Sequence, residues 1–236
     1  MSTAAHKIKL YTNHGCPWAH RAHIALAELG LPFEEEIIDL SVPRTPEYLR
    51  INPRGLVPSL SYDGEIVTES AIVSQFLADA HPSHLLPAAG SKDAALRRAR
   101  IAFFADTYFG KANSLLFKLQ MAGSDAEARE AAAGYVDVVA REVEPLLRDA
   151  APYFGGSDKV TLAEVLTGSF TLRLFSFAKY GIIPESILGS LEQKAPGFYK
   201  WAQVVNSTPS VNGIYDEKTI VERTKHRLAS MKASKA

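Results

Sequence analysis

The first 80 residues of the chain alternate between extended patterns and helical ones. Residues 7–11 and 33–40 each predict a strand, and residues 17–29 between them carry apolar positions at helical spacing and stop before Gly30. Two strands joined by one crossover helix predict a parallel, right-handed βαβ unit.

A ββα pattern follows this unit. Residues 57–61 and 65–67 flank Tyr62-Asp63-Gly64, and the Asp-Gly pair predicts a hairpin. Residues 70–80 then place their apolar side chains on one helical stripe. The combined order predicts a thioredoxin-like α/β domain over residues 1–83.

The remainder of the chain has helical periodicity. A proline and a glycine mark residues 84–92 as a linker, and residues 93–236 predict an all-helical domain. Within it, Thr161-Leu-Ala-Glu164 predicts a capping box that opens an unusually apolar helix, which we expect to run through the middle of the domain. Shorter helices after it lead into a charged tail.

Composition narrows the classes of partner. The 26 basic and 26 acidic residues balance, so no overall field attracts nucleic acid or an acidic membrane. No apolar run reaches the roughly 20 residues of a membrane span, and the first residues lack the apolar core of a secretory signal. We therefore expect a cytoplasmic protein whose partners are small molecules or proteins.

The candidate chemistry centres on Cys16, the only cysteine. It cannot form an intrachain disulfide, which fits a reducing compartment. Pro17 is well placed as a first helical residue, which makes Cys16 the N-cap, facing free amides and the positive end of the helix dipole. A buried, inert thiol is the common alternative for a lone cysteine, but this position predicts a reactive thiolate.

The neighbours of this thiol define the kind of reagent. Ala19 stands where a dithiol oxidoreductase has its resolving cysteine, so the site is monothiol and needs an external thiol such as glutathione. Arg21, His14 and His20 are expected to add positive potential. His20 and His23 lie three residues apart on the predicted helix, but two ligands without a third predict no metal site.

Three motifs resemble those of the cytosolic glutathione transferases. Cys16-Pro-Trp18-Ala is similar to the cysteine-type active site of the omega and lambda classes, residues 52–60 resemble the segment before the family's third strand, and Glu69-Ser70 matches the pair that opens its third helix. The resemblance covers nearly the whole chain. It implies a thioredoxin-like domain followed by an all-helical domain, with Cys16 as the catalytic residue and Trp18 in the glutathione site.

The resemblance also implies how glutathione is held. A cis Val57–Pro58 bond would present the Val57 backbone to the cysteinyl part of glutathione, whereas an isolated proline is usually trans. Ser70 and Glu69 would hold the γ-glutamyl end, although the same pair can be a simple helix cap. Arg44, or a neighbour in the loop before Pro46, is expected to bind the glycyl carboxylate.

The helical domain is expected to supply the pocket for the second substrate. By the same resemblance, Arg173 is similar to an omega-class arginine that faces this pocket, and Phe170 and Tyr108 are further candidates. For the two aromatic residues, packing in the core is the alternative. The sequence does not identify the substrate that fills the pocket.

The function implied by the resemblance is that of an omega-like glutathione transferase, an enzyme that carries out glutathione-dependent thiol transfer or reduction through Cys16. Deglutathionylation and dehydroascorbate reduction fall within it. The alternatives are glutathione conjugation or C–S bond formation or cleavage on a secondary metabolite, and a noncatalytic glutathione-binding module. The expected partners are glutathione, as co-substrate, and a small electrophile, disulfide or S-conjugate. A homodimer is expected through residues 70–80 and 93–120.

Overall fold

The structure is a computed structural model that describes residues 6–233. Its N-terminal part contains a four-stranded sheet with the strand order β2-β1-β3-β4. The strands are β1 (Ile8–Thr12), β2 (Glu34–Ile37), β3 (Ser59–Tyr62) and β4 (Glu65–Thr68). β1 and β2 are parallel, while β3 pairs antiparallel with both β1 and β4. This confirms the predicted βαβ unit and hairpin, although β2 is shorter than the predicted strand.

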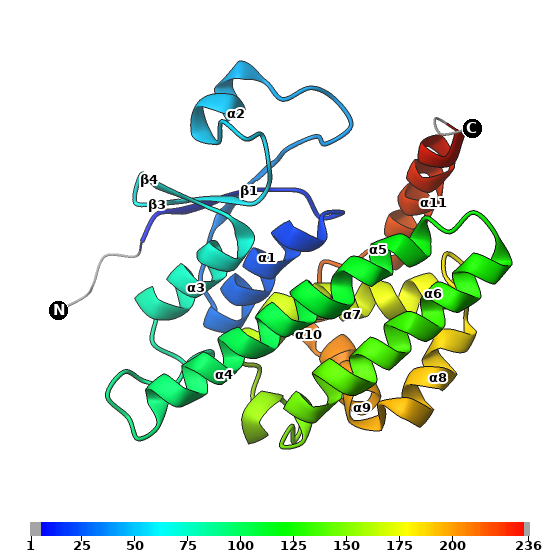
Figure 1. Ribbon diagram of the computed structural model, residues 1–236. Helices are drawn as coiled ribbons and strands as arrows, with labels where there is room; N and C mark the ends of the chain where they lie inside the picture. The colour runs from blue at the N-terminus through cyan, green and yellow to red at the C-terminus, as the bar shows by residue number, and fades with distance from the viewer. Residues whose placement is uncertain (1–5, 234–236) are drawn as a thin grey trace.

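Two helices of this part lie between the sheet and the helical part of the molecule (Figure 1). They are α1 (Pro17–Leu29) and α3 (Ser70–Ala80), and both have the predicted bounds. α1 ends at Gly30, whose φ of 61° is the left-handed conformation that glycine adopts without steric cost. The short helix α2 (Pro46–Ile51) lies on the other side of the sheet.

The C-terminal part is helical, as predicted. Its central helix, α7 (Leu162–Lys179), is buried along almost its whole length and packs against both α1 and α3. The other helices are α4 (Ala94–Thr107), α5 (Ser114–Gln120), α6 (Asp125–Val138), α8 (Ser186–Lys194), α9 (Pro196–Ser207), α10 (Pro209–Asn212) and α11 (Glu217–Ala233).

The first turn of α7 contains a fully buried carboxylate. Glu164 accepts hydrogen bonds from the amide of Thr161 at 2.9 Å, the amide of Phe154 at 2.8 Å and the indole of Trp201 at 2.8 Å. The Thr161 hydroxyl donates to it as well, at 2.7 Å. The predicted capping box is therefore present, and it joins three segments of the helical part.

Two features of the helical part differ from the prediction. The helical periodicity over residues 93–120 does not form one regular helix, because a π-helical turn at Tyr108–Asn113 joins α4 to α5. The charged tail forms α11, which buries Ile220, Val221 and Leu228 on a narrow stripe that its many charged residues obscured. Within residues 6–233, no helix is both long enough and apolar enough to cross a membrane.

Candidate active site around Cys16

The thiol of Cys16 lies at the junction of β1 and α1. Cys16 is the N-cap of α1, with Pro17 as the first helical residue, and its side chain makes no capping hydrogen bond. Its backbone is fixed on both sides, because its amide donates to the Asn13 carbonyl at 3.0 Å and its carbonyl accepts from the His20 amide at 3.1 Å. The local geometry therefore orients a partly exposed thiol at a helix N-terminus, as predicted.

Two side chains of α7 hold the backbone beside this thiol. The Ser169 hydroxyl donates to the Pro17 carbonyl at 2.8 Å. The guanidinium of Arg173 donates to the Gly15 carbonyl at 3.1 Å and to the Ser169 carbonyl at 2.8 Å. The residues on either side of Cys16 are thus bonded to a helix more than 150 positions away in sequence.

Arg21 joins the two parts of the molecule from the α1 side. Its guanidinium is buried and donates to the Leu166 carbonyl of α7 at 2.8 Å and to the Ser70 hydroxyl of α3 at 2.9 Å. Burial lowers the pKa of Arg21 to about 9, although the charges of Tyr108 and Cys16 raise it in part. Arg21 therefore remains a cation at neutral pH, as expected for a source of positive potential.

Arg173 occupies a different place from the predicted one. The resemblance put it in the second-substrate pocket, but its side chain is buried beside Gly15 and over the ring of Tyr215, 5.1 Å from the ring centroid. Burial lowers the pKa of Arg173 to about 10, and the charges of Tyr215 and Cys16 raise it in part. Arg173 thus supports the Cys16 loop and places a second cation near the thiol.

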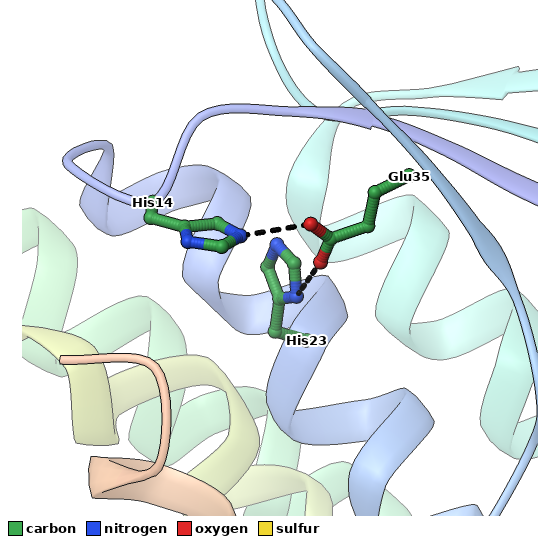
Figure 2. Close-up of side chains that lie close together, drawn as sticks. All are labelled: His14, His23 and Glu35. Carbon is green, nitrogen blue, oxygen red and sulfur yellow. Dashed lines mark hydrogen bonds and ion pairs between the residues drawn. The ribbon is translucent and has the colours of Figure 1, made fainter.

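The two histidines of the expected set lie in different surroundings. His20 is fully buried, and burial, followed by the charge of Arg173, lowers its pKa well below the usual value, so it is neutral at pH 7. His14 points away from helix α7 toward Glu35, to which its Nε2 atom lies at 2.9 Å (Figure 2). Of the expected set, Arg21 is the residue whose charge interacts with Cys16, and Arg173 adds a second guanidinium.

The Val57–Pro58 peptide bond is cis in the structure. The Val57 side chain is buried in a small apolar cluster against which Cys16 also packs. Its backbone amide and carbonyl take no part in the hydrogen bonds among the described residues, because β3 begins two residues later. A peptide-like ligand beside the thiol can therefore pair with this backbone.

Glu69 and Ser70 lie at the N-terminus of α3. Glu69 is the N-cap, with a positive φ of 69°, and its carboxylate pairs with Arg54 at the surface. Ser70 is the first helical residue and is buried, with its hydroxyl accepting from Arg21. The pair does not form the simple side-chain helix cap that was the alternative, since Glu69 makes no such bond.

Arg44 is largely committed to its own loop. Its guanidinium donates to the carbonyls of Gly55 at 3.0 Å and Asp39 at 2.6 Å, and also to those of Leu40 and Val42. These bonds fix residues 39–44 beside α2. Contact between Arg44 and a glycyl carboxylate stays a prediction.

The aromatic residues of the predicted site fall into two groups. Trp18 is 40% exposed and lies against Phe170 and Phe109, with ring centroids 4.7 and 5.4 Å away. Tyr108 is fully buried against Phe104 and Phe198, so its prediction as a pocket residue is wrong and the core alternative is correct.

A cavity of about 440 Å³ opens between α3, α4 and α7. Trp18 and Arg21 border it, and Phe109, the residue after Tyr108, lines it from the π-helical turn. Phe109 is missing from the predicted pocket because the extra residue of a π-helical turn rotates the following side chains, and the apolar pattern does not reveal such a turn.

Known proteins share this fold and sequence. Residues 15–80 match the glutathione S-transferase N-terminal domain. The probable glutathione S-transferase GSTU1 of Oryza sativa subsp. japonica is 34% identical over 217 residues, which cover 85% of this chain and 88% of the relative.

Solved structures agree with the sequence comparison. Rice GST1 (OsGSTU1) in complex with glutathione has a TM-score of 0.80 at 26% identity and covers 97% of this chain and 99% of its own. Glutathione transferase Omega 2C of Trametes versicolor also has a TM-score of 0.80, at 27% identity, covering 94% and 99%. On its similarity to the rice relative over most of both chains, this chain belongs to the glutathione S-transferase family of enzymes.

Proposed function

We propose that this enzyme is an omega-like, cysteine-type glutathione transferase whose principal reaction is glutathione-dependent thiol transfer. The observation that carries the proposal is the position of Cys16, a thiol without a hydrogen bond at the N-terminus of α1, with the guanidinium groups of Arg21 and Arg173 acting on it from opposite elements. A helix N-terminus and adjacent cations favour the charge of a thiolate.

The reaction follows from a single thiol. The Cys16 thiolate attacks the glutathione sulfur of a mixed disulfide, a Cys16–glutathione disulfide forms, and the substrate leaves as a thiolate that takes up a proton from solvent. A second glutathione thiolate then attacks the same glutathione sulfur. This step releases glutathione disulfide and regenerates the Cys16 thiolate. Because Ala19 stands where a resolving cysteine would be, the second exchange requires external glutathione.

Glutathione is placed by elements that converge on the thiol. The unpaired backbone of Val57 pairs with the cysteinyl part, next to the cis proline Pro58. Ser70 and Glu69, at the N-terminus of α3, hold the γ-glutamyl end, where free helix amides favour a carboxylate. Trp18 covers one side of the site, and Arg44 would need to release loop carbonyls to reach the glycyl carboxylate.

The cavity beside Trp18 and Phe109 is the space that we assign to the second substrate. Phe170 supports this space from behind through its contacts with both rings. The cavity is lined mainly by apolar side chains and so suits an apolar or aromatic group attached to the disulfide or S-conjugate. Dehydroascorbate is a less fitting substrate, because it is small and polar.

The organisation of the chain completes the proposal. We assign residues 1–83 to the glutathione-binding domain, 84–92 to the linker and 93–236 to the helical domain. Exposed apolar side chains on α3 and α4, at Ile72 and Phe103 among others, support a homodimer through these helices. The lone, partly exposed thiol supports a cytoplasmic location.

A comparison of two reactions tests the proposal. The Cys16→Ser variant is expected to lose thiol-transferase turnover with a small mixed disulfide of glutathione by about a thousandfold or more, because a serine hydroxyl cannot form the intermediate. Conjugation of glutathione to an aryl halide serves as the matched reaction, since a hydroxyl can still donate to a glutathione thiolate. Equal thiol-transferase rates for the parent and the variant would rule out the mechanism.

A further inference from the structure

A group of three potential metal ligands lies next to the Cys16 loop, on the side away from α7. Nε2 of His14 is 2.9 Å from one carboxylate oxygen of Glu35, and Nδ1 of His23 is 3.3 Å from the other (Figure 2). One ligand atom from each residue lies within 4.8 Å of those of the other two. The three side chains converge from different elements, because His14 belongs to the loop after β1, His23 to α1 and Glu35 to β2.

These distances are close to those of a metal site. Zn²⁺ binds imidazole nitrogen and carboxylate oxygen at about 2.0–2.2 Å, which places tetrahedral ligand atoms about 3.3 Å apart. Each histidine nitrogen is already near this separation from one of the two carboxylate oxygens of Glu35, and the three ligand atoms lie within 4.8 Å of one another, so small side-chain shifts complete the set. His14 is exposed and can rotate to do so, whereas His23 is buried and fixed.

The surroundings of His23 are those of an oriented ligand. Its Nε2 atom lies 2.8 Å from the hydroxyl of Thr12, which is fully buried. A hydrogen on Nε2 leaves the Nδ1 lone pair directed toward Glu35, and this arrangement, in which the distal ring nitrogen is bonded to a second group, is typical of metal-binding histidines. The ring also packs edge-on against Phe33, which restricts its rotation.

We propose that His14, His23 and Glu35 bind one divalent transition-metal ion of the zinc type, with solvent as the fourth ligand. Two imidazoles and one carboxylate are a ligand set that zinc accepts in open sites. The ion reaches the site from solvent past His14, which is 47% exposed. Helical spacing pairs His23 with His20, but the group in the structure joins His23 to His14 and Glu35 instead.

The proposed ion changes the connections of the active-site loop. His14 lies two residues before Cys16, so a bound ion ties this loop to β2 and to the middle of α1. The α7 side of the same loop is already held by Ser169 and Arg173. The metal therefore fixes the loop from its second side without contacting the groups that hold it on the first.

The test uses the full chain with the Cys16→Ser substitution, so that the thiol does not bind the metal. Zn²⁺ is titrated in competition with a chromophoric chelator, and Co²⁺ is added separately as a spectroscopic probe. We expect one Zn²⁺ per chain, a visible Co²⁺ spectrum of four- or five-coordinate intensity, and a rise in the thermal unfolding midpoint on metal addition.

Exposed ligands provide variants that are expected to fold. His14→Ala and Glu35→Gln should each weaken Zn²⁺ binding at least about tenfold and remove the Co²⁺ spectrum. His84→Ala is the matched control. His84 also forms a histidine–carboxylate pair, with Glu28 at 2.8 Å. Among the described residues, however, this pair does not belong to a group of three potential ligands. The control variant should leave both readouts unchanged.

The proposal is overturned by any of three results. The first is the absence of stoichiometric Zn²⁺ binding in the Cys16→Ser protein. The second is binding that His14→Ala and Glu35→Gln leave intact. The third is an equal loss of affinity in His84→Ala, which would mean that the metal binds surface histidines without a built site.

Discussion

The α/β part and the helical part of this enzyme both position Cys16, but they do so over very different distances in sequence. In the α/β part, the thiol is oriented by its immediate neighbours in the chain. The Asn13 carbonyl accepts a hydrogen bond from the Cys16 amide, and Pro17 begins the helix whose N-cap is Cys16. In the helical part, three hydrogen bonds to this region come from α7, about 150 residues away.

The contacts from α7 form a regular pattern. Leu166, Ser169 and Arg173 are spaced by three and four positions, so they lie on one face of the helix. Two of them bond to the backbone around Cys16, and the third accepts from Arg21. The comparison shows that one half of the active site is a local property of the sequence, whereas the other half exists only after α7 has packed on α1.

The largest expected effect is on the helical part. Glu164→Ala removes the acceptor for four donors in the buried start of α7, so we expect the free energy of unfolding to fall by about 3 to 5 kcal/mol. Urea unfolding followed by circular dichroism measures this change. If α7 is what completes the active site, the surviving folded fraction should also show increased thiol reactivity toward a bulky alkylating reagent.

Glu144→Ala is the matched control for this experiment. Glu144 also accepts two amide hydrogen bonds, from Gly197 and Phe198 at the start of α9, but it is only partly buried and has no contact with the Cys16 region. We expect a smaller loss, about 1 to 2 kcal/mol. Equal losses in the two variants would show that burial of Glu164 has no special role.

The second effect is at the junction of the two parts. Ser70→Ala should weaken glutathione binding by about 1 to 3 kcal/mol, because a hydrogen bond to a charged group is lost. The structure adds a second consequence: Arg21 loses an acceptor, so stability should decrease by a similar amount even without glutathione. Calorimetry and urea unfolding measure the two quantities separately.

Ser74→Ala tests whether the effect belongs to Ser70 itself. Ser74 lies one turn later on α3 and is also buried, but its hydroxyl donates to the Ser70 carbonyl and does not contact Arg21. Glutathione affinity should stay at the parent value in this variant. A matching loss of affinity in both serine variants would contradict a direct role for the Ser70 hydroxyl.

A third effect depends on pH. Because burial lowers the pKa of His20 well below its usual value of about 6.5, the unfolded chain binds a proton on acidification that the native protein does not. The contribution of the neutral His20 to stability is complete above pH 6.5. As the pH falls below 6.5, the free energy of unfolding should decrease by up to about 1.4 kcal/mol per pH unit. Urea unfolding at pH 7 and pH 5 should show a shallower loss for His20→Gln than for the parent.

His226→Gln provides the comparison for this slope, since His226 is exposed on α11. Its pH dependence should follow that of the parent protein. A parent-like slope in His20→Gln would mean that His20 is protonated in the native state.

The smallest effect separates core from pocket. Tyr108→Phe should change the KM for the second substrate less than about twofold, because the side chain is fully buried and does not line the cavity. Phe109→Ala, one residue later, should raise that KM by a larger factor, since Phe109 borders the cavity. A larger change in KM for Tyr108→Phe than for Phe109→Ala would contradict this assignment of the pocket.

The sequence predicted the features that depend on neighbours in the chain. The strand–Cys16–Pro17–helix junction, the hairpin at Asp63-Gly64 and the capping box at Glu164 each have a local pattern, and the structure contains them. A cysteine at a helix N-cap follows from a proline at the next position, whatever the rest of the chain does.

The features that failed depend on tertiary packing. Arg173 and Tyr108 were placed by analogy, but α7 turns Arg173 toward Gly15, and a π-helical turn puts Phe109 in the cavity where Tyr108 was expected. His20 and His23 share a helix, yet their side chains lie in different surroundings. Helical spacing tells which residues share a face and not what covers that face.

Mass spectrometry of the intact protein after treatment with glutathione disulfide tests the central claim most directly. The account predicts one glutathionyl adduct per chain, located at Cys16 by peptide mapping and removed by excess glutathione, because the thiol has no internal resolving partner. The Cys16→Ser protein should acquire no adduct. If the parent protein also remains unmodified while it still reduces a glutathione mixed disulfide, Cys16 is not the reagent.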